Sequence, residues 1–144
     1  MEENLIEFYS EEIDFPAIDV ERVSRWIAEV VKQHDLELGE ITYNFTNDDR
    51  ILEYNKQYLQ HDFYTDLLTF DYDHDGVVSG DIVISLDTVA SNAEQYGTDP
   101  DEELLRVIIH GVLHLCGIDD KGPGEREIME AEENKALALY ATVE

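Results

Sequence analysis

The fold is decided by residues 104–120, Leu104-Leu-Arg-Val-Ile-Ile-His110-Gly-Val-Leu-His114-Leu-Cys-Gly117-Ile-Asp-Asp120. Apolar side chains cover most of the circumference of the helix that this stretch predicts. Such coverage indicates a helix buried at the centre of the molecule rather than one lying on its surface. Gly117 suits the left-handed conformation that ends a helix, so we expect the chain to turn back after it. The stretch therefore predicts a buried central helix followed by a tight return.

Four polar residues stand at intervals of four along this helix: Glu102, Arg106, His110 and His114. On an α-helix this spacing places them in a single stripe. Burying such a stripe without partners would be costly in free energy, so we expect it to face a polar cleft, an ion or a hydrogen-bond network. We interpret the stripe as the lining of an active cleft.

The histidine pair predicts a metal centre. Two histidines one helical turn apart can offer their imidazole nitrogens to one ion, and the glycine and carboxylate that follow resemble the loop-back of zinc-dependent hydrolases. Asp120 is the predicted third ligand beside His110 and His114. Asp119 competes for that place; otherwise it would hydrogen-bond to a ligand or cap the turn. One Zn2+ ion is favoured because imidazole and carboxylate suit it, with manganese, nickel and iron as alternatives.

Other residues near the pair are outside candidates for the ion. Cys116 lies roughly 200° around the helix from His114, so we predict that it belongs to the core. His61 and His74 fall at a predicted helix end and in a turn, where histidines are usually solvated, and His61 is the better candidate. Gly111 occupies the position at which zinc peptidases of the His-Glu-x-x-His type carry their general base, so peptidase chemistry is not expected.

Composition and charge bound the class of protein. The chain has 144 residues, enough to bury a core, and we predict that residues 1–144 form a single domain. The 9 basic residues against 35 acidic ones give a net charge of −26, which repels nucleic acids and anionic membranes at long range. Solvated acidic helices or a halophilic source would account for this charge. The sequence shows no apolar run of membrane-spanning length and no leader pattern, so we expect a cytoplasmic protein.

Periodicity along the rest of the chain predicts four strands and five helices. The strands are expected at 4–9, 41–46, 67–72 and 77–86, with the last two forming a hairpin around the turn at 73–76. The helices are expected at about 20–34, 48–60, 87–96, 100–116 and 124–140. Asp19 is the predicted cap of the first helix, and Asn47 or Asp48 that of the second.

The motifs together resemble one family. Residues 110–120 resemble the His-Gly-x-Leu-His-Leu-x-Gly-x-Asp-His signature of the YbeY family, bacterial metal-dependent endoribonucleases and ribosomal RNA maturation factors. Further stretches resemble the family's upstream segments in the same order: Leu52-Glu-Tyr-Asn55-Lys-Gln-Tyr58, Asp62, Thr65-Asp66-Leu-Leu-Thr-Phe70 and Gly80-Asp81-Ile-Val-Ile-Ser85. The resemblance spans residues 52–120, about half of the chain.

The resemblance implies both a fold and a function. The implied fold is α+β, with a mixed, roughly four-stranded sheet packed with about five helices, zincin-like and with a buried central helix that bears the metal. The implied activity is that of a single-strand-specific endoribonuclease in the maturation of the 3′ end of small-subunit ribosomal RNA and in ribosome quality control. The implied partners are ribosomal RNA and the small ribosomal subunit. Basic ribosomal proteins would suit the acidic body by electrostatic complementarity, whereas DNA and membranes are not expected.

Two positions depart from the family's pattern. Asp120 stands where the family has a third histidine, and a carboxylate there leaves a bound ion less positive. Leu59 stands where the family has an arginine implicated in catalysis. Stabilisation of the charge that develops on a phosphate then falls to the ion and to Arg106, Lys121 or Arg126.

These residues lead to one main function and two alternatives. His114 and Arg106 are the predicted catalytic residues, with Arg106 as a phosphate contact or, alternatively, in an ion pair with Glu102. The first alternative is a ribosome-assembly binding factor with a structural metal and reduced or no nuclease activity. The second is a generic metal hydrolase acting on a small anionic substrate.

Overall fold

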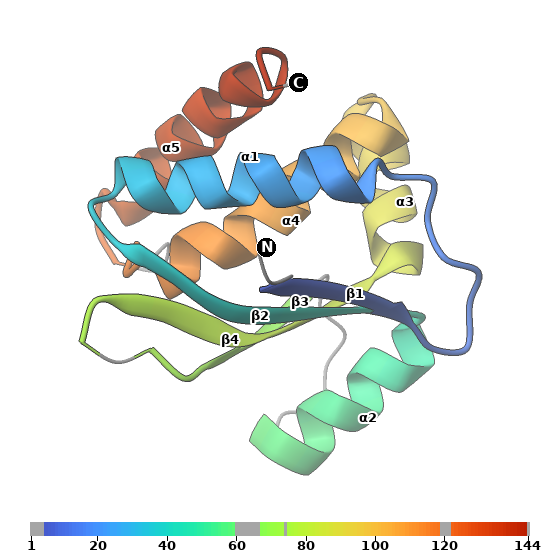
Figure 1. Cartoon of the computed structure of the whole chain (residues 1–144). Coiled ribbons are helices and arrows are strands. Elements are labelled where there is room, and N and C mark those ends of the chain that lie inside the picture. The colour runs from blue at the N-terminus through green and yellow to red at the C-terminus, as the bar shows by residue number, and fades with distance from the viewer. Residues whose placement is uncertain (1–4, 60–66, 74, 119–121, 144) are drawn as a thin grey trace.

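The computed structural model describes residues 5–59, 67–73, 75–118 and 122–143. Within them the chain forms one mixed sheet and five helices, as Figure 1 shows, which confirms the expected α+β class. The strands are β1 (Ile6–Ser10), β2 (Glu37–Thr46), β3 (Leu67–Asp71) and β4 (Val77–Ser85). The helices are α1 (Val20–Gln33), α2 (Asp48–Leu59), α3 (Leu86–Tyr96), α4 (Pro100–Leu115) and α5 (Glu125–Tyr140). None of the described helices is long and apolar enough to cross a bilayer.

The sheet has the strand order β1-β2-β4-β3. Strands β1, β2 and β4 run parallel, and β3 pairs antiparallel with β4, so the predicted hairpin is confirmed. Strand β2 begins four residues before the predicted start at Ile41. The pairing of β2 with β4 shifts in register between Leu38 and Ile41, and this irregularity interrupts the alternation by which a strand is recognised. The sequence pattern therefore marks only the regular part of β2.

Side chains at the helix starts act as predicted. Asp19 caps α1. Of the two candidates at α2, Asn47 is the cap, because its side-chain oxygen accepts the N–H of Arg50 at 2.8 Å. The Asp48 carboxylate instead accepts the hydroxyl of Ser85, at the end of β4. Asp48 thus ties the start of α2 to the sheet.

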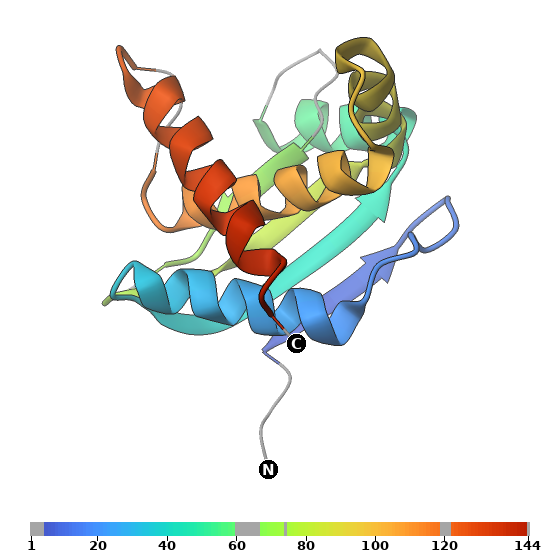
Figure 2. The ribbon, with the colours of Figure 1, turned by 90° about the horizontal axis from the view of Figure 1, so that it is seen from above.

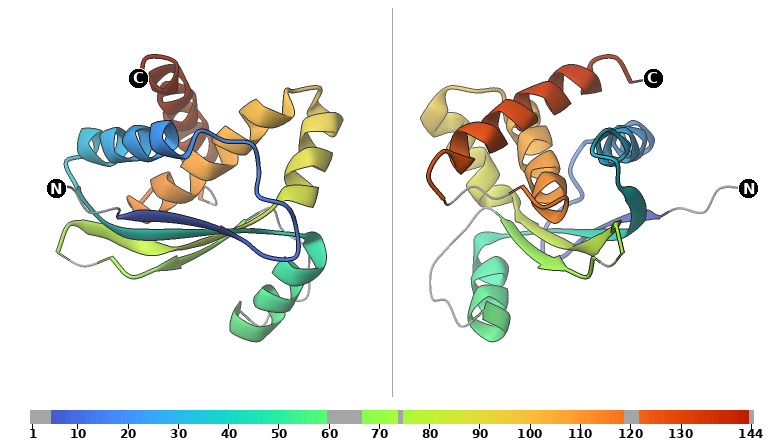
Figure 3. Two further views of the ribbon diagram at one scale, coloured as in Figure 1. Left: turned by 45° about the vertical axis from the view of Figure 1, so that its right-hand side comes forward. Right: turned by 90° about the vertical axis from the view of Figure 1, so that its left-hand side faces the viewer.

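The helices cover the two faces of the sheet unequally. Helices α1 and α4 pack on one face with α3 and α5 on the same side, whereas α2 alone lies on the other (Figures 1 and 3). The view in Figure 2 shows α5 crossing over α4 on its outer side. Trp26 of α1 is fully buried, and its Nε1 donates to the carbonyl of Ala136 of α5 at 2.6 Å. One side of the sheet is therefore layered. On the other, which we call the open face, α2 is the one helix among the described residues.

Helix α4 is the buried central helix that the sequence predicts. Most of its apolar residues from Leu104 to Leu115 are buried in the main core. Two glycines let it lie close to β4: a Cβ on Gly111 would stand 2.9 Å from Ile82 Cδ1, and one on Gly80 would stand 3.1 Å from a methyl of Leu115. Both distances are shorter than ordinary van der Waals contact, so glycine at these positions sets the spacing between helix and sheet.

Helix α4 ends as predicted. Gly117 has a φ of 98°, in the left-handed region that favours glycine. Its N–H bonds to the carbonyl of His114, and the N–H of Ile118 bonds to that of Leu113, which satisfies carbonyls at the helix end. The chain therefore turns at Gly117, and residues 119–121 lie outside the described part of the chain.

Candidate functional site

The polar stripe of α4 faces α5 and forms a hydrogen-bond network with it. Glu133 of α5 contacts two members of the stripe at once. Its Oε2 lies 2.6 Å from His110 Nδ1, and its Oε1 accepts from Arg106 Nη1 at 2.9 Å. The His110 and Glu133 side chains are 22% and 10% exposed, so the contact is sheltered from bulk water. Two of the four stripe residues, Arg106 and His110, thus meet a hydrogen-bond network, one of the three surroundings that the sequence predicts.

Arg106 bonds to α5, whereas one of the predicted roles paired it with Glu102 on its own helix. One terminal nitrogen of its guanidinium donates to Glu133, and the other donates to the Asn134 side chain at 2.8 Å. These bonds fix the guanidinium beside His110. Its role as a phosphate contact stays a prediction.

Glu133 stays ionised in this setting. Burial by itself raises the pKa of the Glu133 carboxyl, but the hydrogen bonds and charges of His110 and Arg106 outweigh burial and hold the pKa below its ordinary value. A carboxylate that keeps its charge can only accept hydrogen bonds. It therefore orients donors on both of its neighbours.

An open pocket lies beside this network. It has a volume of about 420 Å³, and Arg106, His110 and Glu133 form part of its wall. Arg126, which the sequence offered as an alternative phosphate contact, lines the same pocket, together with the exposed Tyr96. Two arginines thus face one concavity in a chain whose net charge is −26. Of the four stripe residues, Arg106 and His110 line this concavity, whose wall also holds the carboxylates of Glu103, Glu130 and Glu133. That it is the active cleft stays a prediction.

The three-ligand metal site stays a prediction. His114 lies one turn after His110 on α4 and is half-buried. Among the residues that the structure describes, no group of three or more histidine, cysteine, aspartate or glutamate side chains could hold an ion. Several predicted site residues lie outside the described residues: His61, His74, Asp119, Asp120 and Lys121. Leu59 is the last residue of α2.

Cys116 belongs to the core, as predicted. It is half-buried and packs against the main apolar cluster. Burial, with a smaller contribution from the charge of Asp73, raises the pKa of its thiol to about 12. It lines a different hollow from the one that His110 lines. A protonated thiol of this kind is a poor metal ligand.

Glu133 is the residue that sequence reasoning missed. Helix α5 is rich in glutamate, so one more acidic residue attracts no notice. Yet Met129, Glu133 and Ala136 are the buried residues of α5, and they stand four and three positions apart. This spacing defines the buried face of a helix. A glutamate on the otherwise apolar buried face of α5 was the sequence signal that could have identified Glu133.

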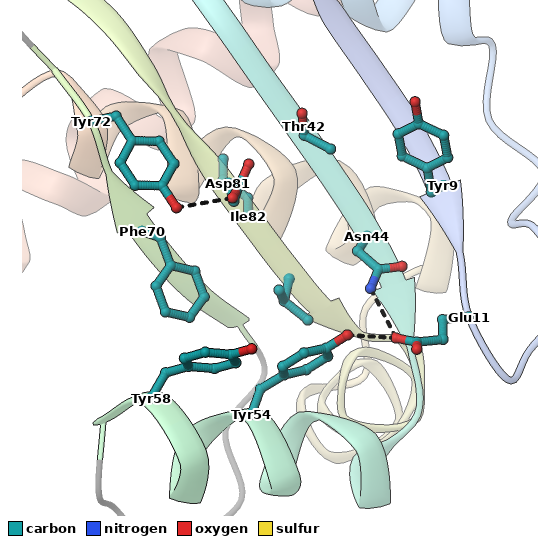
Figure 4. A pocket seen from close by; sticks show the side chains of 11 residues that line it. Tyr9, Glu11, Thr42, Asn44, Tyr54, Tyr58, Phe70, Tyr72, Asp81 and Ile82 are labelled. Carbon is teal, nitrogen blue, oxygen red and sulfur yellow. Dashed lines mark hydrogen bonds between the residues drawn. The ribbon is translucent and has the colours of Figure 1, made fainter.

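A second concavity lies on the open face of the sheet, shown close up in Figure 4. We call it the tyrosine groove, and its volume is about 520 Å³. Its rings come from β1, α2, β3 and the turn after β3: Tyr9, Tyr54, Tyr58, Phe70 and Tyr72. Two of the tyrosine hydroxyls donate hydrogen bonds to carboxylates, Tyr54 to Glu11 at 2.8 Å and Tyr72 to Asp81 at 3.1 Å. The groove is aromatic and acidic, with no histidine among its described lining residues.

Comparisons with known proteins show which family this chain resembles. Residues 6–141 match the family model described as Endoribonuclease YbeY. A protein of Parabacteroides distasonis with that name is 58% identical over 134 residues, 93% of this chain and 94% of its own length. One of Phocaeicola vulgatus, with the same name, is 59% identical over 137 residues, 95% of this chain and 99% of its own.

A solved structure shows the same fold. The solution structure of a Thermotoga maritima protein aligns with a TM-score of 0.65 at 29% identity, covering 94% of this chain and 88% of that one. The match therefore extends well beyond the segment around the histidines.

Proposed function

This chain belongs to the Endoribonuclease YbeY family, and we propose that it is a zinc-dependent endoribonuclease that cuts single-stranded RNA. Its substrate would be the precursor of the small-subunit ribosomal RNA, processed at the 3′ end. The observation that carries the proposal is His110, the first histidine of the α4 pair, in the wall of a pocket with two arginines, in a chain whose relatives are named endoribonucleases. Those names do not favour a binding factor without nuclease activity.

The residues present fit a zinc ion chemically. His110 turns Nδ1 toward Glu133, so an ion would take this ring through Nε2. His114 and, from outside the described residues, Asp120 would complete a set of two imidazoles and one carboxylate, a donor set that suits zinc. When bound, such an ion polarises a phosphate oxygen and lowers the pKa of a bound water.

The arginines of the pocket would bind the substrate. A phosphodiester is an anion, and the net charge of −26 repels it at long range. Arg106 and Arg126 line the pocket that His110 lines, beside the carboxylates of Glu103, Glu130 and Glu133. Their guanidinium groups can donate paired hydrogen bonds to a phosphate, so they would hold it next to His110. We therefore assign substrate positioning to these arginines.

We also propose the small ribosomal subunit as the partner and the cytoplasm as the location. Basic ribosomal proteins complement the acidic body of this chain, and such complementarity would bring it to the ribosome more readily than to bare RNA.

The test is an RNA cleavage assay with a matched variant. Purified protein holding one equivalent of zinc should cut a single-stranded RNA oligonucleotide and leave a duplex of the same sequence intact. His114→Ala should cut neither substrate. Electrophoresis of end-labelled RNA measures cleavage, and elemental analysis measures zinc. Equal cleavage by the native protein and His114→Ala, or no cleavage by the zinc-loaded native protein, overturns the proposal.

A further inference from the structure

We infer that Glu133 is a positioning residue: it fixes the His110 ring in the tautomer and orientation that present Nε2 to a metal ion. This inference rests on the proposed metal-dependent function. It concerns a residue on a different helix from the predicted ligands, outside the stretch that carries the histidines. Three features of the molecule support this role: the proton on His110, the fixed ring and the anchored helix that carries Glu133.

The first feature is the proton on His110. Glu133 Oε2 lies 2.6 Å from His110 Nδ1, which is hydrogen-bond distance. Glu133 Oε1 accepts from Arg106 at 2.9 Å, and a carboxylate that pairs with an arginine in this way accepts on both oxygens, so Nδ1 must be the nitrogen that carries hydrogen. In a neutral imidazole the other nitrogen, Nε2, then holds its lone pair. The contact therefore selects the tautomer that a metal would bind through Nε2.

The second feature is the fixed carboxylate and, with it, the fixed ring. Both oxygens of Glu133 are engaged, Oε2 by His110 and Oε1 by Arg106. Arg106 is held in turn by Asn134, at 2.8 Å. A carboxylate bonded through both oxygens has little freedom to rotate, so the His110 ring that depends on it has little as well. Preorganisation of this kind lowers the entropy that a ligand loses when a metal binds.

The third feature is the anchored helix α5. Glu133 lies on the buried face of α5 between Met129 and Ala136. The carbonyl of Ala136, one turn further along, accepts the indole N–H of the fully buried Trp26 at 2.6 Å. The position of Glu133 is therefore set by the core, and α5 is a rigid support for the histidine.

The helix offers a matched control. Glu132 is the next residue on α5, and it pairs with His34 at 3.3 Å and with Lys135 at 3.2 Å. Glu132→Gln removes the same charge from the same helix without touching the network of His110. Glu133→Gln removes the charge from the network with almost no change in side-chain volume.

The first measurement is zinc affinity, by competition with a chromophoric chelator. Glu133→Gln should bind zinc roughly 10- to 100-fold more weakly than the native protein, the usual cost of losing a carboxylate behind a ligating histidine. Glu132→Gln should bind as the native protein does. Thermal unfolding checks that both variants are folded. Native-like zinc affinity in folded Glu133→Gln overturns the inference.

The second measurement needs no variant and no metal. In zinc-free native protein, the nitrogen-15 chemical shifts of the imidazoles report the tautomer directly. His110 should carry its proton on Nδ1 when the ring is neutral. A proton on Nε2 overturns the inference even if Glu133→Gln does not fold.

The two proposals fail in different ways. Tight zinc binding that depends on Glu133, without RNA cleavage, upholds the positioning role and overturns the nuclease. RNA cleavage with a zinc affinity indifferent to Glu133 does the opposite. Native protein that binds no zinc at all overturns the metal centre itself.

Discussion

Glu133 and Glu11 are both carboxylates paired with an arginine, but they lie in different surroundings. Glu133 is 10% exposed, on the buried face of α5, and its two oxygens contact Arg106 and His110. Glu11 is 32% exposed, at the end of the tyrosine groove, and pairs with Arg50 at 3.1 Å. For both groups burial raises the pKa, but hydrogen bonds outweigh it and hold the pKa below the ordinary value.

The other hydrogen-bond partners of Glu11 and Glu133 give the two carboxylates different roles. Glu11 accepts from Tyr54 of α2 and Asn44 of β2, which Figure 4 shows, so it joins a helix to the sheet. Glu133 also joins two elements, but one of its partners is an imidazole of the predicted metal site. The same arrangement of a carboxylate and an arginine therefore holds elements together at one place and orients a histidine at the other.

We expect the largest loss of stability from a substitution that buries a carboxylate without a partner. Gly111→Glu would put a carboxylate against Ile82 in the core, where a Cβ alone would stand 2.9 Å from a methyl group. An unpaired buried charge should lower the free energy of unfolding by more than about 4 kcal/mol. Urea denaturation measures this loss. A stably folded variant would contradict the placement of position 111 against the sheet.

The next largest loss of stability should distinguish Glu133 from Glu11. Glu133→Ala leaves Arg106 and His110 without their shared acceptor, which should lower the free energy of unfolding by roughly 2–3 kcal/mol. Glu11→Ala, at a more exposed site, should cost about 1 kcal/mol or less. Both are measured by urea denaturation at neutral pH. Equal losses would mean that burial between α4 and α5 does not strengthen the Glu133 network.

A smaller effect concerns acid stability. Because the pKa of Glu11 is lower in the folded protein, its contribution is present above its ordinary value of 4.5 and is lost as the pH falls through the folded value. Glu11→Gln cannot make this contribution at any pH. The stability of the variant should therefore fall less steeply than that of the native protein below pH 4.5. Parallel pH profiles of the urea midpoint would contradict this expectation.

The smallest effect is expected at the exposed edge of the groove. Tyr9 is 53% exposed, and its hydroxyl donates to Glu7 near the start of the chain. Tyr9→Phe should leave the urea midpoint and the cleavage of RNA unchanged within error. A measurable loss of cleavage would show that the tyrosine groove takes part in binding the substrate.

Local features of this fold could be predicted from the sequence. Helix α4, a cap of α2 at Asn47 or Asp48 and the turn at Gly117 each depend on residues close together in the chain. The start of β2 could not, because a shift of register near Gly39 depends on how the strand pairs with β4. Strand pairing joins residues far apart in sequence, and no local pattern encodes it.

The candidate site also has one part that could be predicted from the sequence and one part that could not. The stripe of α4 that includes His110 could be predicted, because helical spacing alone places its residues together. Its partner Glu133 could not, because the contact depends on how α5 crosses α4. The tyrosine groove escaped notice for a similar reason: parallel pairing sets the strands that carry Tyr9 and Asp81 on one sheet, with β2 between them.

The bond between Trp26 and Ala136 has a practical consequence. The chain contains one tryptophan, so its fluorescence comes from a single, fully buried indole whose N–H is bonded to α5. The Tyr140 ring of the same helix lies edge-on to it, with centroids 4.9 Å apart. Loosening of α5 would expose the indole to water and shift its emission to longer wavelength. The protein thus carries its own optical reporter on the helix that supports His110.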